Sequence, residues 1–179
     1  MSVLVVSSGL GSPKTKSLLL AREAERVLVA DGTPVTLLDL RELTLPLCGT
    51  QESFTHPHTA RALELVAAAD AILLCTPIYN YDANAVAKNF IELTGKGWEN
   101  KVVGFLCAAG GEKSFMSVMP LANSLMLDFR CVIVPRFVYA TGSAFAADGA
   151  IAHPDIAGRI AQCARATAQL GAAVKALLQ

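Results

Sequence analysis

The chain has 179 residues, of which 53% are hydrophobic and 17% charged, and its 15 basic residues balance its 15 acidic ones. The length predicts a single domain over residues 1–179. The zero net charge removes the long-range field that draws proteins to nucleic acids or anionic membranes, so we expect neither as a partner. The low charged share favours burial of apolar surface between subunits, in a homodimer or homotetramer.

The cysteines and the start of the chain both indicate a cytoplasmic protein. The five cysteines are odd in number and contain no Cys-x-x-Cys spacing, which predicts free thiols in a reducing compartment. The chain opens directly into the apolar run 3–6 without a basic leader. No apolar run approaches the roughly 18 residues of a membrane-spanning helix.

Short apolar runs alternate with segments of helical spacing along the whole chain. Strands are expected at residues 3–7, 35–40, 71–75, 102–107 and 132–139, the last with an interruption. Helices are expected at residues 17–30, 59–68, 84–94, 114–127 and 154–178, and the stretches 41–58 and 141–153 are predicted to be irregular. Strict alternation predicts an α/β three-layer sandwich around a five-stranded parallel sheet, with the flavodoxin-like order 2-1-3-4-5.

Ligands of such sheets bind beyond the carboxyl ends of the strands, so the loops after the first, third and fourth strands carry the candidate site. The first loop is rich in hydroxyl and basic side chains and leads directly into a helix. Hydroxyls, free backbone N–H groups and a positive helix end suit a phosphate group, although a solvated loop with an N-cap at Ser17 is the alternative. The candidate phosphate-binding residues are Ser8, Ser12, Lys14, Thr15, Lys16 and Ser17.

Two sharper phosphate-binding motifs fail in this loop, and a receiver domain does not fit the end of the first strand. A dinucleotide fingerprint needs a third glycine where the chain has Lys14, and a Walker loop needs glycines where it has Leu10 and Thr15. A phosphoacceptor receiver domain would have an acidic pair in place of Ser7 and Ser8. We therefore expect the loop to bind a monophosphate.

The second and third loops suit a planar ligand. Two tyrosines after the third strand can flank an aromatic ring, or can merely pack on the turn. The glycine pair after the fourth strand permits close approach of a ring to the backbone, although the pair alone indicates only a turn. The candidate residues are Pro77, Ile78, Tyr79, Asn80 and Tyr81 in the second loop and Ala109, Gly110 and Gly111 in the third.

In this order the three loops resemble the NAD(P)H-dependent FMN reductase family, which includes quinone and azo-dye reductases. The most specific match is the run 76–80, Thr-Pro-Ile-Tyr-Asn, followed by Val86 and by Lys88-Asn89 in a helix. Two positions depart from the family pattern: Asn84-Ala85 replaces a frequent Pro-Gly, and Lys14 or Lys16 replaces an arginine.

The resemblance implies a flavin-dependent oxidoreductase. The first loop would surround the phosphate of FMN, and the other two would lie against its ring. Hydride would pass from NADPH or NADH to flavin N5, and then electrons to a small-molecule acceptor such as free flavin, a quinone or an azo compound. The chemistry is carried by the flavin, so no catalytic side chain is expected, and no metal site is expected either.

The main alternative is a flavodoxin-type electron carrier, which binds FMN without a nicotinamide site. Carriers of that class rely on a strongly acidic docking surface, and a net charge of zero therefore favours the enzyme. A flavin-free module that binds NAD(P) is a third possibility. The remaining candidate, the pair His56 and His58, is expected to be two solvated loop histidines rather than metal ligands.

Overall fold

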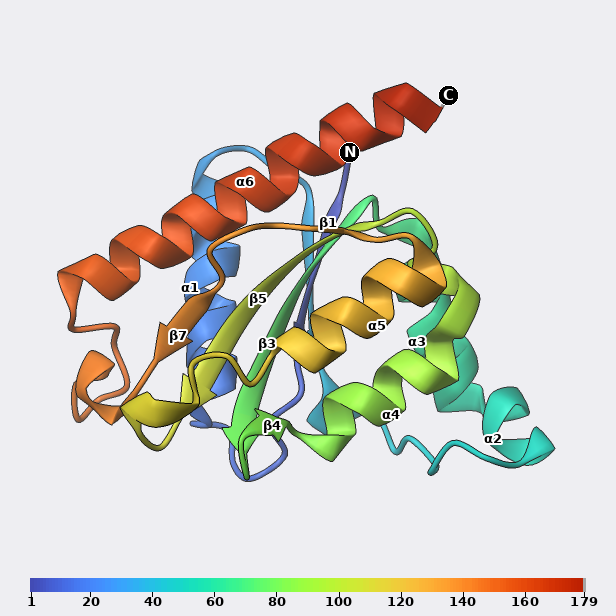
Figure 1. Cartoon of the computed structure of the whole chain (residues 1–179), viewed down its shortest axis with the longest axis horizontal. Helices are drawn as coiled ribbons and strands as arrows, with labels where there is room; N and C mark the ends of the chain where they lie inside the picture. The colour runs from blue at the N-terminus through green and yellow to red at the C-terminus, as the bar shows by residue number, and fades with distance from the viewer. Residues whose placement is uncertain (179) are drawn as a thin grey trace.

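The central sheet has the predicted order, and the five positions expected from the sequence are confirmed. The computed structural model describes residues 1–178. Across the sheet the strands are β2 (Val35–Asp39), β1 (Val3–Ser7), β3 (Ala71–Tyr79) and β5 (Val102–Ala109), followed by β6 (Val132–Ile133) and β7 (Val138–Ala140) (Figure 1). Both β6 and β7 pair in parallel with β5, at its start and near its end, so together they fill the fifth position. This is the 2-1-3-4-5 order of the flavodoxin-like fold.

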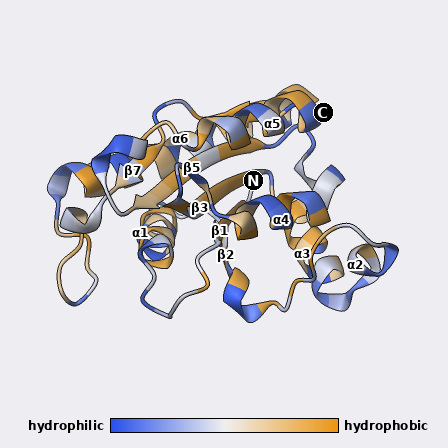
Figure 2. Cartoon of the chain, turned by 60° about the horizontal axis from the view of Figure 1, so that its bottom comes forward, coloured by the Kyte–Doolittle hydropathy of each residue, from blue (hydrophilic) through white to orange (hydrophobic). Residues whose placement is uncertain are grey.

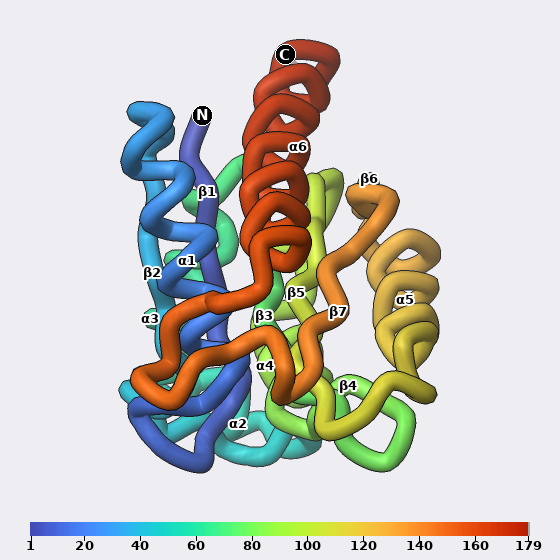
Figure 3. The backbone as a smooth tube through the Cα atoms, turned by 90° about the vertical axis from the view of Figure 1, so that its left-hand side faces the viewer, coloured from blue at the N-terminus to red at the C-terminus, as the bar shows by residue number. Residues whose placement is uncertain are grey.

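Helices cover both faces of the sheet. On one face lie α1 (Lys16–Ala30) and α6 (Pro154–Leu178), and on the other lie α3 (Pro57–Ala68), α4 (Ala85–Thr94) and α5 (Met119–Phe129) (Figure 3). Alternate strand residues contribute to the two cores, because successive side chains of a strand point to opposite faces. Thus Leu73 packs toward α1 and α6, whereas Leu74 packs toward the other three helices.

The third strand is longer than predicted. Strand β3 continues from Cys75 to Tyr79 and then turns back through β4 (Asp82–Ala83). In the sequence, Pro77 favours a turn. In the structure its carbonyl accepts a hydrogen bond from Asn84 N–H, on the side of β3 that faces away from β5. The N–H that proline lacks would point to that same side, so no hydrogen bond to β5 is lost. The extension carries the second candidate loop beyond the end of β1.

Two helices also differ from the prediction. Residues 41–58, expected to be irregular, contain the short helix α2 (Gln51–Thr55), which Thr50 caps through a bond from Ser53 N–H. Five residues are too few to show a helical period, which is why the sequence gives no signal there. Helix α5 begins at Met119 rather than at residue 114, because residues 112–114 form a separate 3₁₀ turn.

The cysteines and the hydropathy pattern agree with a well-filled core. The central strands β3 and β5 are hydrophobic along their length (Figure 2). All five cysteines are free, and only Cys48 is more than slightly exposed. Burial raises the pKa of both Cys131 and Cys163 to about 11, so these thiols are protonated at neutral pH. None of the helices between residues 1 and 178 is long and apolar enough to cross a membrane.

Candidate functional site

A pocket of about 430 Å³ lies at the carboxyl ends of the strands, at the lower end of the sheet in Figure 1. It joins the three loops that the sequence singles out. Its lining residues are Gly9, Lys14, Thr15, Lys16, Ser17, Pro77, Ile78, Tyr79, Ala108, Ala109 and Gly110. The volume falls within the roughly 300–1,000 Å³ typical of small-molecule and cofactor sites.

Two residues of the first loop that line this pocket, Thr15 and Ser17, carry buried hydroxyl groups without hydrogen-bond partners among residues 1–178. Thr15 occupies the N-cap position of α1 but makes no side-chain cap bond, and the first turn holds no acidic residue. Buried hydroxyls and uncapped N–H groups at a helix start are donors suited to an anion.

Gly9 leaves the space that these hydroxyls occupy. A Cβ atom at this position would lie 2.3 Å from Ser17 Oγ and 3.1 Å from Thr15 Oγ1. Since 2.3 Å is far below van der Waals contact, any side chain here would displace the Ser17 hydroxyl. Gly9 is a lining residue that sequence reasoning missed, although a glycine at the start of a phosphate-binding loop is a usable signal.

Two lysines give this side of the pocket its positive charge. Lys14 and Lys16 are exposed, and neither forms a salt bridge in the part of the chain that the structure describes. The ammonium group of Lys16 lies 5.7 Å from the centroid of the Phe145 ring, a cation–π contact with the segment that follows β7. Within residues 1–178, no carboxylate therefore competes with an anionic ligand for either lysine.

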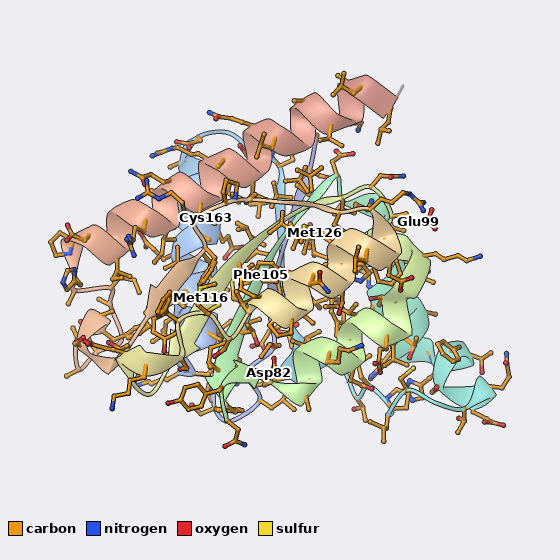
Figure 4. All side chains as sticks on the ribbon, viewed as in Figure 1. Asp82, Glu99, Phe105, Met116, Met126 and Cys163 are labelled. Carbon is orange, nitrogen blue, oxygen red and sulfur yellow. The ribbon has the colours of Figure 1, made fainter. Side chains whose placement is uncertain are left out.

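The second loop is the tip of a two-residue hairpin between β3 and β4. Asn80 and Tyr81 both have left-handed backbone angles, with φ of 51° and 63°, as a type I′ turn requires. For a bulky residue such as Tyr81 this conformation costs roughly 1–2 kcal/mol. Tyr79 lines the pocket and is 59% exposed. Figure 4 shows Asp82 at this same end of the sheet.

The third loop is open on the side of the pocket. A Cβ atom at Gly110 or Gly111 would meet no atom within 4 Å, and neither glycine has a left-handed φ. The packing of the chain therefore does not require glycine at either position. The loop is held by Tyr139 of β7, whose hydroxyl lies 2.7 Å from Ser114 Oγ and donates to the Gly111 carbonyl.

Five predicted residues lie near the pocket without lining it. The Ser8 hydroxyl is buried and donates to Asn84 Oδ1 over 2.9 Å, so Ser8 supports the loop from beneath. Ser12 lies on the surface, where its hydroxyl accepts from the Lys14 N–H. Asn80 and Tyr81 form the hairpin tip, and Gly111 bonds to Tyr139.

His56 and His58 both accept hydrogen bonds from backbone N–H groups. His58 Nδ1 accepts from Thr44 N–H over 2.6 Å, and His56 Nδ1 accepts from His58 N–H over 3.2 Å. Residues 1–178 contain no group of three or more histidine, cysteine or acidic side chains placed to hold a metal ion.

Comparisons with known proteins agree with this geometry. Residues 1–146 match the profile of the family described as NADPH-dependent FMN reductase. The chain is 27% identical over 166 residues to an NAD(P)H-dependent FAD/FMN reductase of Geobacillus thermodenitrificans, covering 92% of this chain and 90% of that protein.

Two further matches are also proteins named as NADPH- or NAD(P)H-dependent reductases or oxidoreductases. An NADPH azoreductase of Bacillus sp. strain OY1-2 is 29% identical over 116 residues, covering 64% of this chain and 65% of that protein. Among solved structures, the flavoenzyme NAD(P)H:(acceptor) oxidoreductase of Paracoccus denitrificans superposes with a TM-score of 0.77 at 18% identity, covering 96% of this chain and 97% of that one.

Proposed function

Because the chain belongs to the NADPH-dependent FMN reductase family, we propose that it binds FMN in the 430 Å³ pocket and uses NADPH or NADH to reduce a small-molecule acceptor. The observation that carries this proposal is the pair of buried hydroxyls, Thr15 Oγ1 and Ser17 Oγ, which have no partner among residues 1–178. A buried polar group without a partner costs roughly 1–3 kcal/mol, and a ligand that supplies oxygen acceptors would remove that cost.

The residues of the first loop fit the phosphate group of FMN. Thr15 and Ser17 would donate hydrogen bonds to it, together with N–H groups of the first turn of α1. The exposed Lys14 and Lys16 would add positive charge at the pocket rim. Charge-assisted hydrogen bonds of this kind are about twice as strong as neutral ones.

The other two loops fit the ring of the flavin. The segment 77–79 forms one wall and residues 108–110 form another, and both are mainly backbone and small or apolar side chains. When bound, FMN would supply the redox chemistry, accepting a hydride from the nicotinamide and passing electrons onward. The protein's tasks are to orient the ring, to present backbone N–H groups to its polar edge and to leave one face open. No side chain of the pocket is needed as a nucleophile.

Free flavins, quinones and azo compounds are the proposed acceptors. The relatives named FAD/FMN reductase and azoreductase support the first and third classes. The exposed Tyr79 at the pocket offers an aromatic surface on which flat acceptors of all three classes can stack.

Anaerobic reduction of the reconstituted protein tests the proposal. Purified chain loaded with FMN is mixed with NADPH or NADH under argon, and the visible absorbance of the flavin is followed. Rapid bleaching, faster than for the same concentration of free FMN, is the expected result. Bound flavin that keeps its colour would contradict the enzyme and favour a carrier, and tight NAD(P) binding without any FMN binding would favour a flavin-free module.

Steady-state kinetics then identify the acceptor. Rates are measured over a panel of free flavins, quinones and azo dyes at several NAD(P)H concentrations. A scheme in which the nicotinamide leaves before the acceptor arrives gives parallel lines in double-reciprocal plots. Intersecting lines would exclude that order of events.

A further inference from the structure

The side chain of Asn84 fills the fork at which β1 separates from β3. The two strands pair as far as Ser7 and Cys75, after which β1 ends and β3 continues beside β5 without β1. Asn84 immediately precedes α4, and its backbone N–H donates to the Pro77 carbonyl over 3.1 Å. It therefore lies beside the part of β3 that β1 has left.

Every polar atom of the Asn84 side chain is used in this fork. Its Oδ1 accepts from Ser8 Oγ over 2.9 Å, from Thr76 Oγ1 over 3.1 Å and from Ala87 N–H over 3.1 Å. Its Nδ2 donates to the Ser8 carbonyl over 2.7 Å. The residue is only 5% exposed, and Ser8 and Thr76 are fully buried.

These bonds join the two halves of the pocket. Ser8 directly precedes Gly9, at which the first loop enters the pocket, and Thr76 directly precedes Pro77, at which the ring-side wall begins. Asn84, Ser8 and Thr76 do not themselves line the pocket. The contact network thus links the phosphate-side loop to the ring-side loop from beneath.

We propose that Asn84 is a positioning residue, which fixes the spacing between the phosphate-binding and ring-binding halves of the site. This inference rests on the proposed function. A ligand that engages both halves gains from their fixed spacing, because binding at one half places its other end at a high effective concentration near the second. A ligand that engages only the ring-side half gains nothing from the link.

The pair FMN and riboflavin separates these cases, since riboflavin has the same ring but no phosphate group. The variant Asn84→Ser keeps a hydroxyl that can cap α4 but is too short to reach Ser8. Binding of each flavin to the full-length apoprotein is measured by flavin fluorescence. For Asn84→Ser we expect the FMN affinity to fall about 10-fold and the riboflavin affinity to change by less than about 2-fold.

A variant at the other end of α4 controls for loss of buried hydrogen bonds in general. Thr94 is buried, and its hydroxyl bonds to the Phe90 carbonyl and to Trp98 Nε1. Thr94→Val is expected to lower the melting temperature while leaving the ratio of FMN to riboflavin affinity unchanged. If Asn84→Ser does not fold, Ser8→Ala, which removes one bond of the network, should still lower that ratio, by about 3-fold.

The outcomes distinguish this inference from the proposed function. Failure of the wild-type protein to bind FMN more tightly than riboflavin overturns the proposed function itself. A wild-type preference for FMN that Asn84→Ser and Ser8→Ala leave intact, or an equal loss for both flavins, overturns only the positioning role.

Discussion

The candidate site and a second, larger hollow lie in different parts of the molecule, and they differ in whether their polar side chains are buried or exposed. The larger hollow, of about 960 Å³, lies between the fifth strand position and the first half of α6. Its polar lining includes Arg136, His153 and Arg159, all of which are exposed. We call it the edge groove. The candidate pocket has less than half that volume, about 430 Å³.

The pocket contains buried polar atoms without partners, and the edge groove does not. Within residues 1–178 the buried unpaired side-chain atoms are Ser7 Oγ, Thr15 Oγ1 and Ser17 Oγ, and the last two belong to residues that line the pocket. Water satisfies the exposed side chains of the edge groove. A buried polar atom without a partner lowers the stability of the folded chain, and folding itself does not require it. Such an atom therefore indicates a binding site better than the volume of a cavity does.

Closing the space at Gly9 should have the largest effect. In Gly9→Val the new side chain displaces the Ser17 hydroxyl and fills the phosphate side of the pocket. We expect the FMN affinity to fall at least about 100-fold, because about two charge-assisted hydrogen bonds of roughly 1.5–3 kcal/mol each are lost. Fluorescence titration with FMN measures the loss.

Gly11→Val is the matched control for this variant. A Cβ atom at Gly11 would make only an ordinary contact, 3.7 Å from Thr15 Cγ2, and Gly11 does not line the pocket. Its FMN affinity should stay near the wild-type value. Equal losses for the two valine variants would show that the flexibility of the loop matters, and not the space at Gly9.

Removing an unpaired hydroxyl should weaken binding and strengthen the fold. In Ser17→Ala a buried group without a partner is lost, so the apoprotein should gain up to about 1 kcal/mol in free energy of unfolding. The FMN affinity should fall roughly 10-fold to 100-fold, since one charge-assisted bond is missing. Denaturant unfolding and FMN titration measure the two effects.

Ser124→Ala provides the comparison on another helix. The Ser124 hydroxyl bonds to the Pro120 carbonyl within α5, away from the pocket. This variant should not change FMN binding. A Ser17→Ala apoprotein that is less stable than the wild type would mean that its hydroxyl is satisfied within the folded chain, and the comparison between pocket and groove would then fail.

The sequence is sufficient to predict the layers of the fold and most of the residues that line the pocket. Hydrophobic period and the right-handed crossover rule lead to the observed strand order. Lys14, Thr15 and Ser17 could be chosen from the sequence because loops after parallel strands meet at one edge. For these three residues, residue type and place in the fold together were enough to predict that they line the pocket.

The supporting residues could not be predicted, because their partners are distant in sequence. Asn84 bonds to Ser8 across 76 positions, and Tyr139 bonds to Gly111 across 28. In the sequence, Asn84 is notable only as the first residue of an expected helix and as a departure from the family pattern, and Tyr139 only as the end of an apolar strand. For the same reason Ser8 was predicted to bind phosphate. In a run of small residues, the sequence does not distinguish a buried residue that supports a loop from one that binds a ligand.

The glycines of the third loop should give a smaller effect than the phosphate side. Gly110 lines the pocket and Gly111 does not, yet a Cβ atom at either meets no atom of the chain within 4 Å. Both alanine variants should therefore keep the wild-type melting temperature. Gly110→Ala alone should lower the FMN affinity, by about 3-fold to 10-fold, because its methyl group enters space that the ring would use. A loss in Gly111→Ala but not in Gly110→Ala would place the ring elsewhere.

The edge groove should give the smallest effect. Arg136 and Arg159 form no salt bridge within residues 1–178, so the double variant Arg136→Ala/Arg159→Ala leaves no buried charge unpaired and should change stability by less than about 0.5 kcal/mol. FMN affinity and the rate of anaerobic reduction should both stay within about 2-fold of the wild type. NADPH and NADH are compared, because two arginines could bind the additional phosphate of NADPH. A selective loss of the NADPH rate would assign the edge groove to the nicotinamide cofactor, and would show that a site built from exposed arginines can be functional without any buried unpaired group.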